Sequence, residues 1–556
     1  MRFPRRVTYC LLGAVVLVTI LFRYPLGSAH EMGSDTTFIH SLTDSLIARA
    51  SAVWILNPLS YFGLYALSYP SAMPFILGSV SLTGGIPVEG AILLTGAVFS
   101  IVGALSAFAA SRAARDDDRL ALIVALLFSI GPFYVKDTTW VGSSRGFVTA
   151  LVPVVFLLLL RHLRTRDVRY LAICIMLVAM MGTIHRMGML ALLVLVAYGF
   201  AVPIHRLTQR LRFVLVRYES PFRYVSTAAS ITGFLALFYL QVLLPDIAGS
   251  DIVSQYRQGA LFEGTSFPIL VTNMMVSLVG KVGILMPLMI VGLVRLAWDR
   301  PKEDRDKFLL ITVLVMIPLL SLRDYISEFM TYVFVVLIAL ALISRGYRVG
   351  PAYRVNRRKA AAAGLVVALL GASIGFSLVM KNYWSERYYT DGPIPNELYG
   401  TSVYILRQAG GTVLSNEGLS EGRIAAITGL PALPMGGASI HWYSPQQLTF
   451  GFVDGGQVTV RQISVWSISF QTDTIFEPTN VPIAKDDYES IFYNHFDAFP
   501  AEGFLKRYNV NFMFVDKAHE SEFQSYIWRG SPFIVEAQEQ TYKVFDSSSY
   551  SLWYLR

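Results

Sequence analysis

The chain has 556 residues, of which 54% are hydrophobic and only 15% charged, and its mean hydropathy of +0.51 indicates a polytopic membrane protein. Its two cysteines, Cys10 and Cys174, both lie in apolar runs, which excludes a disulfide framework and a cysteine-based zinc site. Residues 381–556 carry 12 Lys+Arg against 19 Asp+Glu, a net charge of −7, so the preceding part carries +15. That excess is an orientation signal for a membrane protein and not a nucleic-acid footprint.

The N-terminus begins with basic residues and one apolar run. Arg2, Arg5 and Arg6 precede the run at residues 7–22. A cleavable signal peptide is one interpretation. A retained anchor is favoured, because the apolar run continues directly into Arg23 and Tyr24 without a clean cleavage pattern.

Apolar stretches along the chain predict about 11 spans, with about 20 residues as the length needed to cross the hydrocarbon layer. They cover residues 7–22, 90–111, 120–135, 146–160, 170–184, 187–205, 225–244, 269–297, 308–322, 329–344 and 360–380. The stretch 269–297 is long, and Lys281 and Gly283 mark the expected break in it.

Basic residues cluster in alternate connections between these spans, at residues 112–115, 161–169, 206–217, 300–307 and 354–359. The positive-inside rule places these clusters and the N-terminus in the cytoplasm. The same topology places residues 30–89, 136–145, 185–186, 245–268 and 323–328 outside, together with everything after Lys381. We therefore expect a plasma-membrane protein with an extracytoplasmic C-terminal part.

The first outer loop, residues 24–89, begins with His30-Glu31-Met32-Gly33-Ser34-Asp35 and so carries two carboxylates near the membrane boundary. An amphipathic helix is predicted next. Its apolar side comprises Phe38, Ile39, Leu42, Leu46 and Ile47, and its polar side His40, Ser41, Asp44 and Arg49. A second helix at 75–82 is too short to cross the bilayer and ends at Gly84-Gly85.

From Tyr383 the composition changes to that of a water-soluble domain. A helix is predicted at residues 396–408, a strand at 412–414, a short helix at 422–428 and a buried strand at 510–515. Residues 533–535 and 542–545 are expected to form a closing pair of strands. These elements predict a mixed α/β domain.

The order of these features resembles the GT-C class of membrane glycosyltransferases, and most closely its protein-mannosyltransferase-like, dolichyl-phosphate-mannose-dependent branch, particularly archaeal members. The similarity rests on residues 30–35, 69–74 and 83–85, and on the C-terminal segments 412–416, 422–423, 429–431 and 508–512. The chain departs from better-known members in lacking an adjacent Asp-Glu pair in the first loop. It also lacks the Trp-Trp-Asp-Tyr-Gly motif, so the oligosaccharyltransferase subclass is not expected.

The resemblance implies a polytopic α-helical membrane protein, residues 1–383, with a C-terminal extracytoplasmic α/β domain, residues 384–556. It implies transfer of a sugar from a polyprenyl-phosphate donor to a protein, glycan or lipid acceptor on the outer face. A carboxylate, Asp35 or Glu31, would then activate or orient the acceptor hydroxyl. Outer cations would hold the donor phosphate, and the candidates are Arg145, His185, Arg186 and Arg323.

Each candidate also has a structural interpretation. Asp35 or Ser34 can cap the following helix, and Glu31 can be a solvated loop charge. The arginines can extend to lipid headgroups or pair locally, and His185 can be a helix-end hydrogen bonder. The sequence shows no metal-ligand spacing and leaves any divalent metal requirement open.

Two other functions remain open at this stage. A non-enzymatic carrier or flippase for lipid-linked sugars would need polar residues in mid-span, where Lys281 is the main example. A scaffold whose outer domain binds a surface component would need no carboxylate facing a cavity.

Overall fold

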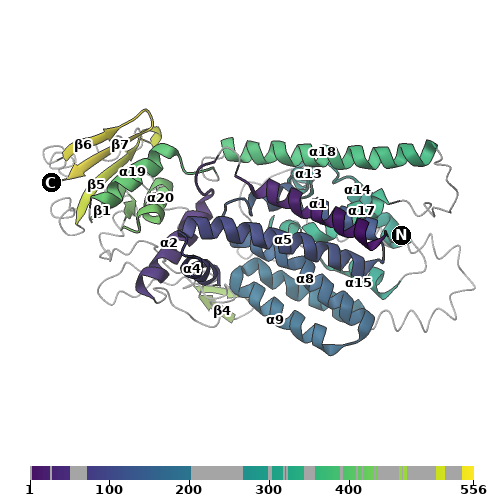
Figure 1. The fold of residues 1–556 in the computed structure, drawn as a ribbon. Helices are drawn as coiled ribbons and strands as arrows, with labels where there is room; N and C mark the ends of the chain where they lie inside the picture. Colours follow the sequence, from purple (N-terminus) through teal and green to yellow (C-terminus); the bar gives the residue numbers. More distant parts are fainter. Residues whose placement is uncertain are drawn as a thin grey trace, which may run out of the picture. The chain divides into compact units, whose positions relative to one another are not determined.

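The computed structural model describes residues 3–25, 28–50, 72–201, 267–298, 303–316, 320, 324–343, 357–387, 392–408, 411–415, 418–430, 432–434, 462–465, 468–471, 509–519 and 541–555 (Figure 1). The chain forms two compact units. The first contains residues 1–24, 96–139 and 144–383, and the second contains residues 25–95, 140–143 and 384–556. The first outer loop is therefore part of the same unit as the C-terminal residues. The division of the chain at residue 383 stays a prediction.

The first unit is helical. Its described helices are α1 (Arg5–Arg23), most of α5 (Val88–Ala114), α6 (Asp118–Ser129), α7 (Pro132–Lys136), α8 (Ser144–Thr165), α9 (Val168–Ile184), η1 (Arg186–Leu190) with its continuation to Ala201, α13 (Phe267–Val282), α14 (Leu288–Trp298), α15 (Asp304–Met316), α16 (Asp324–Phe329), α17 (Thr331–Leu342) and α18 (Arg357–Arg387). Within the described part of the chain, four helices are long and apolar enough to cross a membrane: α1, α5, α8 and the Ala360–Tyr383 part of α18.

Two breaks in the predicted spans have local causes. The 269–297 stretch divides as expected, because α13 ends before Gly283, whose φ of +83° is readily available only to glycine. The 120–135 stretch divides between α6 and α7, which the sequence analysis did not predict. Pro132 stands at the start of α7, where its missing N–H costs no helical hydrogen bond. The span predicted at 225–244 lies outside the described residues.

The second unit contains α2 (Ser34–Arg49), α4 (Ala72–Gly84), α19 (Asn396–Arg407), α20 (Gly418–Thr428) and the short η6 (Lys517–His519). A five-stranded sheet has the order β2-β1-β5-β7-β6. Its strands are β1 (Thr412–Ser415), β2 (Ala432–Pro434), β5 (Val510–Asp516), β6 (Thr541–Asp546) and β7 (Tyr550–Leu555), and a separate antiparallel pair joins β3 (Gln462–Val465) to β4 (Ile468–Gln471). β1 runs parallel to β2 and β5, whereas β7 runs antiparallel to β5 and β6. The predicted mixed α/β domain is confirmed.

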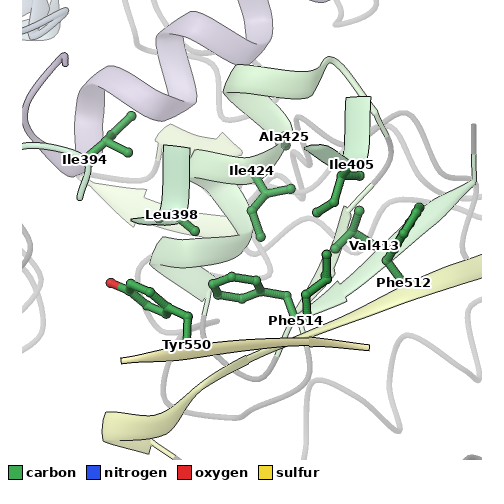
Figure 2. Packing of buried hydrophobic residues seen from close by; sticks show 10 residues of the cluster. Ile394, Leu398, Ile405, Val413, Ile424, Ala425, Phe512, Phe514 and Tyr550 are labelled. Carbon is green, nitrogen blue, oxygen red and sulfur yellow. The ribbon is translucent and has the colours of Figure 1, made fainter. Parts of the chain in front are cut away.

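Buried side chains from the helices and the sheet share one core in this unit. Figure 2 shows Leu398 of α19, Ile424 of α20 and Phe514 of β5 turned toward one another. All three are fully buried, and Tyr550 of β7 lies 5.3 Å from Phe514 between ring centroids. Burial of such side chains contributes roughly 1.5–3 kcal/mol each, so α19 and α20 are held firmly against the sheet.

β6 pairs with β7, a strand that the sequence analysis missed, and the predicted strand at 533–535 lies outside the described residues. One expectation for this unit needs correction. The polar side of α2 is not simply exposed, because His40 and Ser41 are both buried, although Asp44 is partly exposed. α2 packs against both α4 and α20, so it is a core helix of this unit with polar residues inside it.

Candidate functional site

The acidic loop is held between two other backbone segments of the second unit. The Met32 N–H donates to the Trp140 carbonyl at 3.0 Å, and the Ile394 N–H donates to the Glu31 carbonyl at 3.1 Å. Met32 and Pro393 form an antiparallel bridge. Main-chain pairing on both sides fixes the position of the loop far more tightly than a solvated connection would.

The Glu31 carboxylate is buried, with only 1% of the residue exposed. Both of its oxygens lie 2.9 Å from Nδ1 of His40, and Nε2 of the same ring lies 3.3 Å from Oδ2 of Asp44. The interpretation of Glu31 as a solvated loop charge is therefore wrong. His40 and Asp44 are separated by one helical turn of α2, which presents both to the same neighbourhood.

His40 is charged at neutral pH. Burial by itself lowers the pKa of this imidazole, but the charge of Glu31 and the hydrogen bonds to Asp44 and Glu31 outweigh it and raise the pKa to about 10. Both ring nitrogens then donate, one to each carboxylate.

Glu89, at the start of α5, supports the loop from a further side. Its Oε1 accepts the Glu31 N–H at 3.1 Å and lies 3.3 Å from Nδ1 of His30. The His30 ring stacks on Tyr399 of α19. The sequence analysis missed Glu89 and Tyr399, because they approach the loop from other parts of the chain. It missed the role of His40, because only tertiary packing buries that ring against Glu31.

Asp35 lies in the first turn of α2 and is partly exposed. Gly33, with φ of +89°, occupies the position before the helix and no side chain caps it, so neither Asp35 nor Ser34 is the N-cap. A negative charge one turn into a helix is still favoured by the helix dipole. The predicted catalytic role of Asp35 is compatible with this position but stays a prediction.

Two of the four proposed phosphate-binding residues meet at one aromatic ring in the first unit. The guanidinium carbon of Arg145 lies 5.9 Å from the centroid of the Tyr325 ring, and the His185 ring lies perpendicular to it at 5.3 Å. His185 also caps η1, because its Nδ1 accepts the Met187 N–H at 3.0 Å. The side chain of Arg186 and the whole of Arg323 lie outside the described residues.

A group of acidic and basic residues that the sequence analysis did not assign lies near Arg145. Asp137, in the connection between α7 and α8, is buried, and this burial raises the pKa of its carboxyl to about 6 although the charge of Arg145 lowers it. The nearby Glu328 carboxylate adds to the increase. Lys281 Nζ lies 3.0 Å from Oε1 of Glu328, and both side chains are buried.

Lys281 is not a mid-span polar residue that lines a transport path, because its charge is already held by other side chains. It pairs with Glu328 and also lies 3.1 Å from the centroid of the Phe133 ring. A charge fixed in this way is part of the packing of the helices.

The segment that carries Asp137 is fixed by three neighbouring helices. Arg23 of α1 donates from Nε to Thr138 Oγ1 at 3.0 Å and to Ser100 Oγ of α5 at 2.8 Å. A Cβ on Gly146 of α8 would overlap the Asp137 carbonyl, and one on Gly96 of α5 would lie 2.8 Å from the Thr138 carbonyl. Only glycine permits the backbone to approach so closely at these two positions.

Across the described ranges, no group of three or more His, Cys, Asp or Glu side chains is arranged to hold a metal ion. Glu31 contacts His40 and Glu328 contacts Lys281 through Oε1, while Oε2 of Glu328 is buried without a hydrogen-bond partner among the described residues.

No family model and no curated protein sequence matches the chain. Solved structures do match in fold. The oligosaccharyltransferase of Archaeoglobus fulgidus, in its apo form, is 13% identical with a TM-score of 0.57, and the match covers 100% of this chain and 75% of that chain. ArnT from Cupriavidus metallidurans, in the apo state, is 12% identical with a TM-score of 0.53, and the match covers 98% of this chain and 97% of that chain.

The arabinofuranosyltransferase AftD from Mycobacteria is 15% identical with a TM-score of 0.50, and the match covers 100% of this chain but 42% of that chain. The similarity to the oligosaccharyltransferase is one of fold, since the Trp-Trp-Asp-Tyr-Gly motif is absent from this sequence. The chain has the polytopic membrane fold, with a C-terminal sheet domain, of these membrane glycosyltransferases.

Proposed function

We propose that the protein is an integral membrane glycosyltransferase that moves a sugar from a polyprenyl-phosphate donor to an acceptor on the outer face of the membrane. The observation that carries the proposal is the acidic loop, in which a buried Glu31 is fixed four residues before Asp35. The fold supports it. One similar structure, AglB of Archaeoglobus fulgidus at TM-score 0.55, was solved with an inhibitory peptide and a dolichol-phosphate.

The reaction needs one proton acceptor and one stabilised leaving group. An acceptor hydroxyl attacks the anomeric carbon of the donor sugar and forms a new C–O bond, while the bond from that carbon to the phosphate oxygen breaks. The hydroxyl proton passes to a carboxylate, and the polyprenyl phosphate leaves with the bonding electron pair.

Asp35 fits the part of proton acceptor better than Glu31 does. Asp35 is partly exposed in the first turn of α2. Glu31 is buried, and both of its oxygens already contact Nδ1 of His40, so they are less accessible to an acceptor hydroxyl. Glu31 then acts by its fixed charge and by orienting the acceptor.

Arg145 and His185 fit the donor-phosphate side, because both contact the Tyr325 ring. A cation near the leaving phosphate stabilises the charge that develops there as the bond breaks. Arg186 and Arg323 are also proposed to bind the donor phosphate, on the basis of their positions in the sequence alone. A divalent metal is not assigned.

The orientation belongs to the same proposal, with the N-terminus in the cytoplasm and residues 381–556 outside. A reporter that is active only outside the cytoplasm, fused after Lys381, is expected to be active. A cytoplasmic signal at that position would contradict both the orientation and an outer active site.

The function is tested with radiolabelled dolichyl-phosphate-mannose added to membranes from cells with and without the protein. Transfer is expected to move the label from dolichyl-phosphate-mannose to a protein, a glycan or a different lipid, and Arg145→Lys should slow it because Lys lacks the bidentate fork. Arg164→Lys, at an exposed position of α8, is the matched control. Label that crosses the bilayer but stays on the original dolichyl phosphate would instead indicate a carrier, and no movement at all would favour a scaffold.

A further inference from the structure

His40 is a buried imidazole held by two carboxylates from different parts of the second unit. Nδ1 lies 2.9 Å from both oxygens of Glu31, which is in the acidic loop. Nε2 lies 3.3 Å from Oδ2 of Asp44, on the same helix one turn later. His40 thereby ties the conformation of the loop to the body of α2.

The charges around this array come from several elements. Helix α4, which packs on α2, carries no ionisable side chain. Helix α20, which also packs on α2, carries Arg423, whose Nη2 donates to the Gly392 carbonyl at 3.2 Å, and Glu421, whose side chain lies outside the described residues. Helix α5 contributes Glu89, which accepts the Glu31 N–H. Among the described contacts, the charges that touch His40 itself are the two carboxylates.

We propose that His40 is a positioning residue, which keeps Glu31 as an oriented carboxylate and so directs the acceptor proton to Asp35. This inference rests on the proposed function. The His40 imidazolium places a positive charge against both oxygens of the buried Glu31 carboxylate and against Asp44. Without that cation, no ion pair with Glu31 would remain among the described residues, and a buried carboxylate that lacks a partner is costly.

The difference is visible in the pH dependence of transfer. His40→Gln keeps a hydrogen-bond donor near Glu31 but removes the charge. We expect the acidic limb of the kcat profile to move upward, because the variant removes the only cation that contacts the buried Glu31 carboxylate among the described residues. Transfer at pH 6 should then fall more than tenfold and recover at pH 8, with the KM for the donor unchanged.

Asp44→Asn, at the other carboxylate that contacts His40, is the comparison variant. It leaves the contact between His40 and Glu31 in place and should move the acidic limb in the same direction but less far. A His40→Gln variant that keeps the profile of the parent, or that loses activity equally at every pH, would overturn the inference. A parent protein without transfer activity would be a failure of the proposed function and not of this inference alone.

Nitrogen NMR of ring-labelled histidine in the parent protein reads the protonation of the His40 ring without depending on transfer activity. The chain has eight histidines, and His40→Gln or, if it does not fold, Asp44→Asn assigns the His40 signals. We expect both ring nitrogens of His40 to stay protonated at pH 8. A neutral His40 ring at pH 8 would contradict the positioning mechanism.

Discussion

The imidazole of His30 and the phenol ring of Tyr399 are stacked, with ring centroids 3.6 Å apart and an angle of 16° between the planes. His30 begins the acidic loop. Tyr399 belongs to α19, and it packs against the hydrophobic core that α19 shares with the C-terminal sheet. The same loop is paired by its backbone with residues 392–394. The C-terminal part of the chain therefore helps to set the position of the proposed catalytic carboxylates.

Replacing Tyr399 tests this dependence. Tyr399→Ala removes a stacked pair worth roughly 0.5–1.5 kcal/mol and frees one side of His30. Because small displacements of reacting groups can cost about 100-fold in rate, we expect a large loss of kcat in the protein that remains folded. Tyr399→Phe keeps the ring and should transfer normally. Equal activity of the Ala and Phe variants would show that the stack does not position the loop.

Gly146→Ala tests the packing around Asp137. The new Cβ would overlap the Asp137 carbonyl, so the connection between α7 and α8 must shift or the variant loses stability. Overpacking of this kind typically costs about 1–3 kcal/mol. Gly371→Ala in α18 is the control, since a Cβ there meets nothing within 4 Å. Thermal unfolding of both variants in detergent checks the difference, and equal midpoints would contradict the close approach.

Lys281→Met tests the buried pair with Glu328. Removing one partner of a buried ion pair typically costs about 3–5 kcal/mol, because the remaining charge is buried without compensation. The double variant Lys281→Met with Glu328→Gln should recover most of that loss. A measured midpoint of Lys281→Met equal to that of the parent would indicate that water or another cation reaches Glu328.

The pH dependence of stability follows from His40. Its pKa is raised from 6.5 to about 10 in the folded protein, so the folded state binds the proton more tightly than the unfolded state does. The contribution is complete below pH 6.5 and is lost as the pH rises toward 10. Thermal unfolding of both proteins is measured between pH 6 and pH 10. The unfolding midpoint of the parent should fall as the pH rises, and the midpoint of His40→Gln should depend less on pH. Parallel curves would contradict the pairing of His40 with Glu31 and Asp44.

Much of the fold was predictable, because the length of an apolar stretch and the positions of glycine and proline determine locally where a helix or strand ends. The break at Gly283, the short helix that ends at Gly84 and the strand β5 all follow from such signals. β7 was missed, since its six residues follow three serines that gave no expectation of a tight turn. In the structure, the Ser547 N–H donates to the Tyr550 carbonyl at 2.8 Å and closes that turn.

The candidate site was predictable only in part. Glu31 and Asp35 could be chosen because carboxylates are uncommon at a membrane boundary. Their partners could not be chosen, since Glu89, Tyr399 and the Trp140 carbonyl approach the loop from distant parts of the sequence. The burial of His40 contradicts a simple polar face for α2, and only tertiary packing produces it.

The central claim is that Asp35 accepts the proton of the acceptor during sugar transfer, and Asp35→Asn tests it most directly. Asn keeps the size of the side chain but cannot take the proton, and loss of the charge near the start of α2 should cost no more than about 1 kcal/mol. The account predicts a normally inserted, folded protein whose transfer from dolichyl-phosphate-mannose is slower by about 10²–10⁴-fold. Transfer at the rate of the parent would contradict it and leave Glu31 as the remaining carboxylate of the loop.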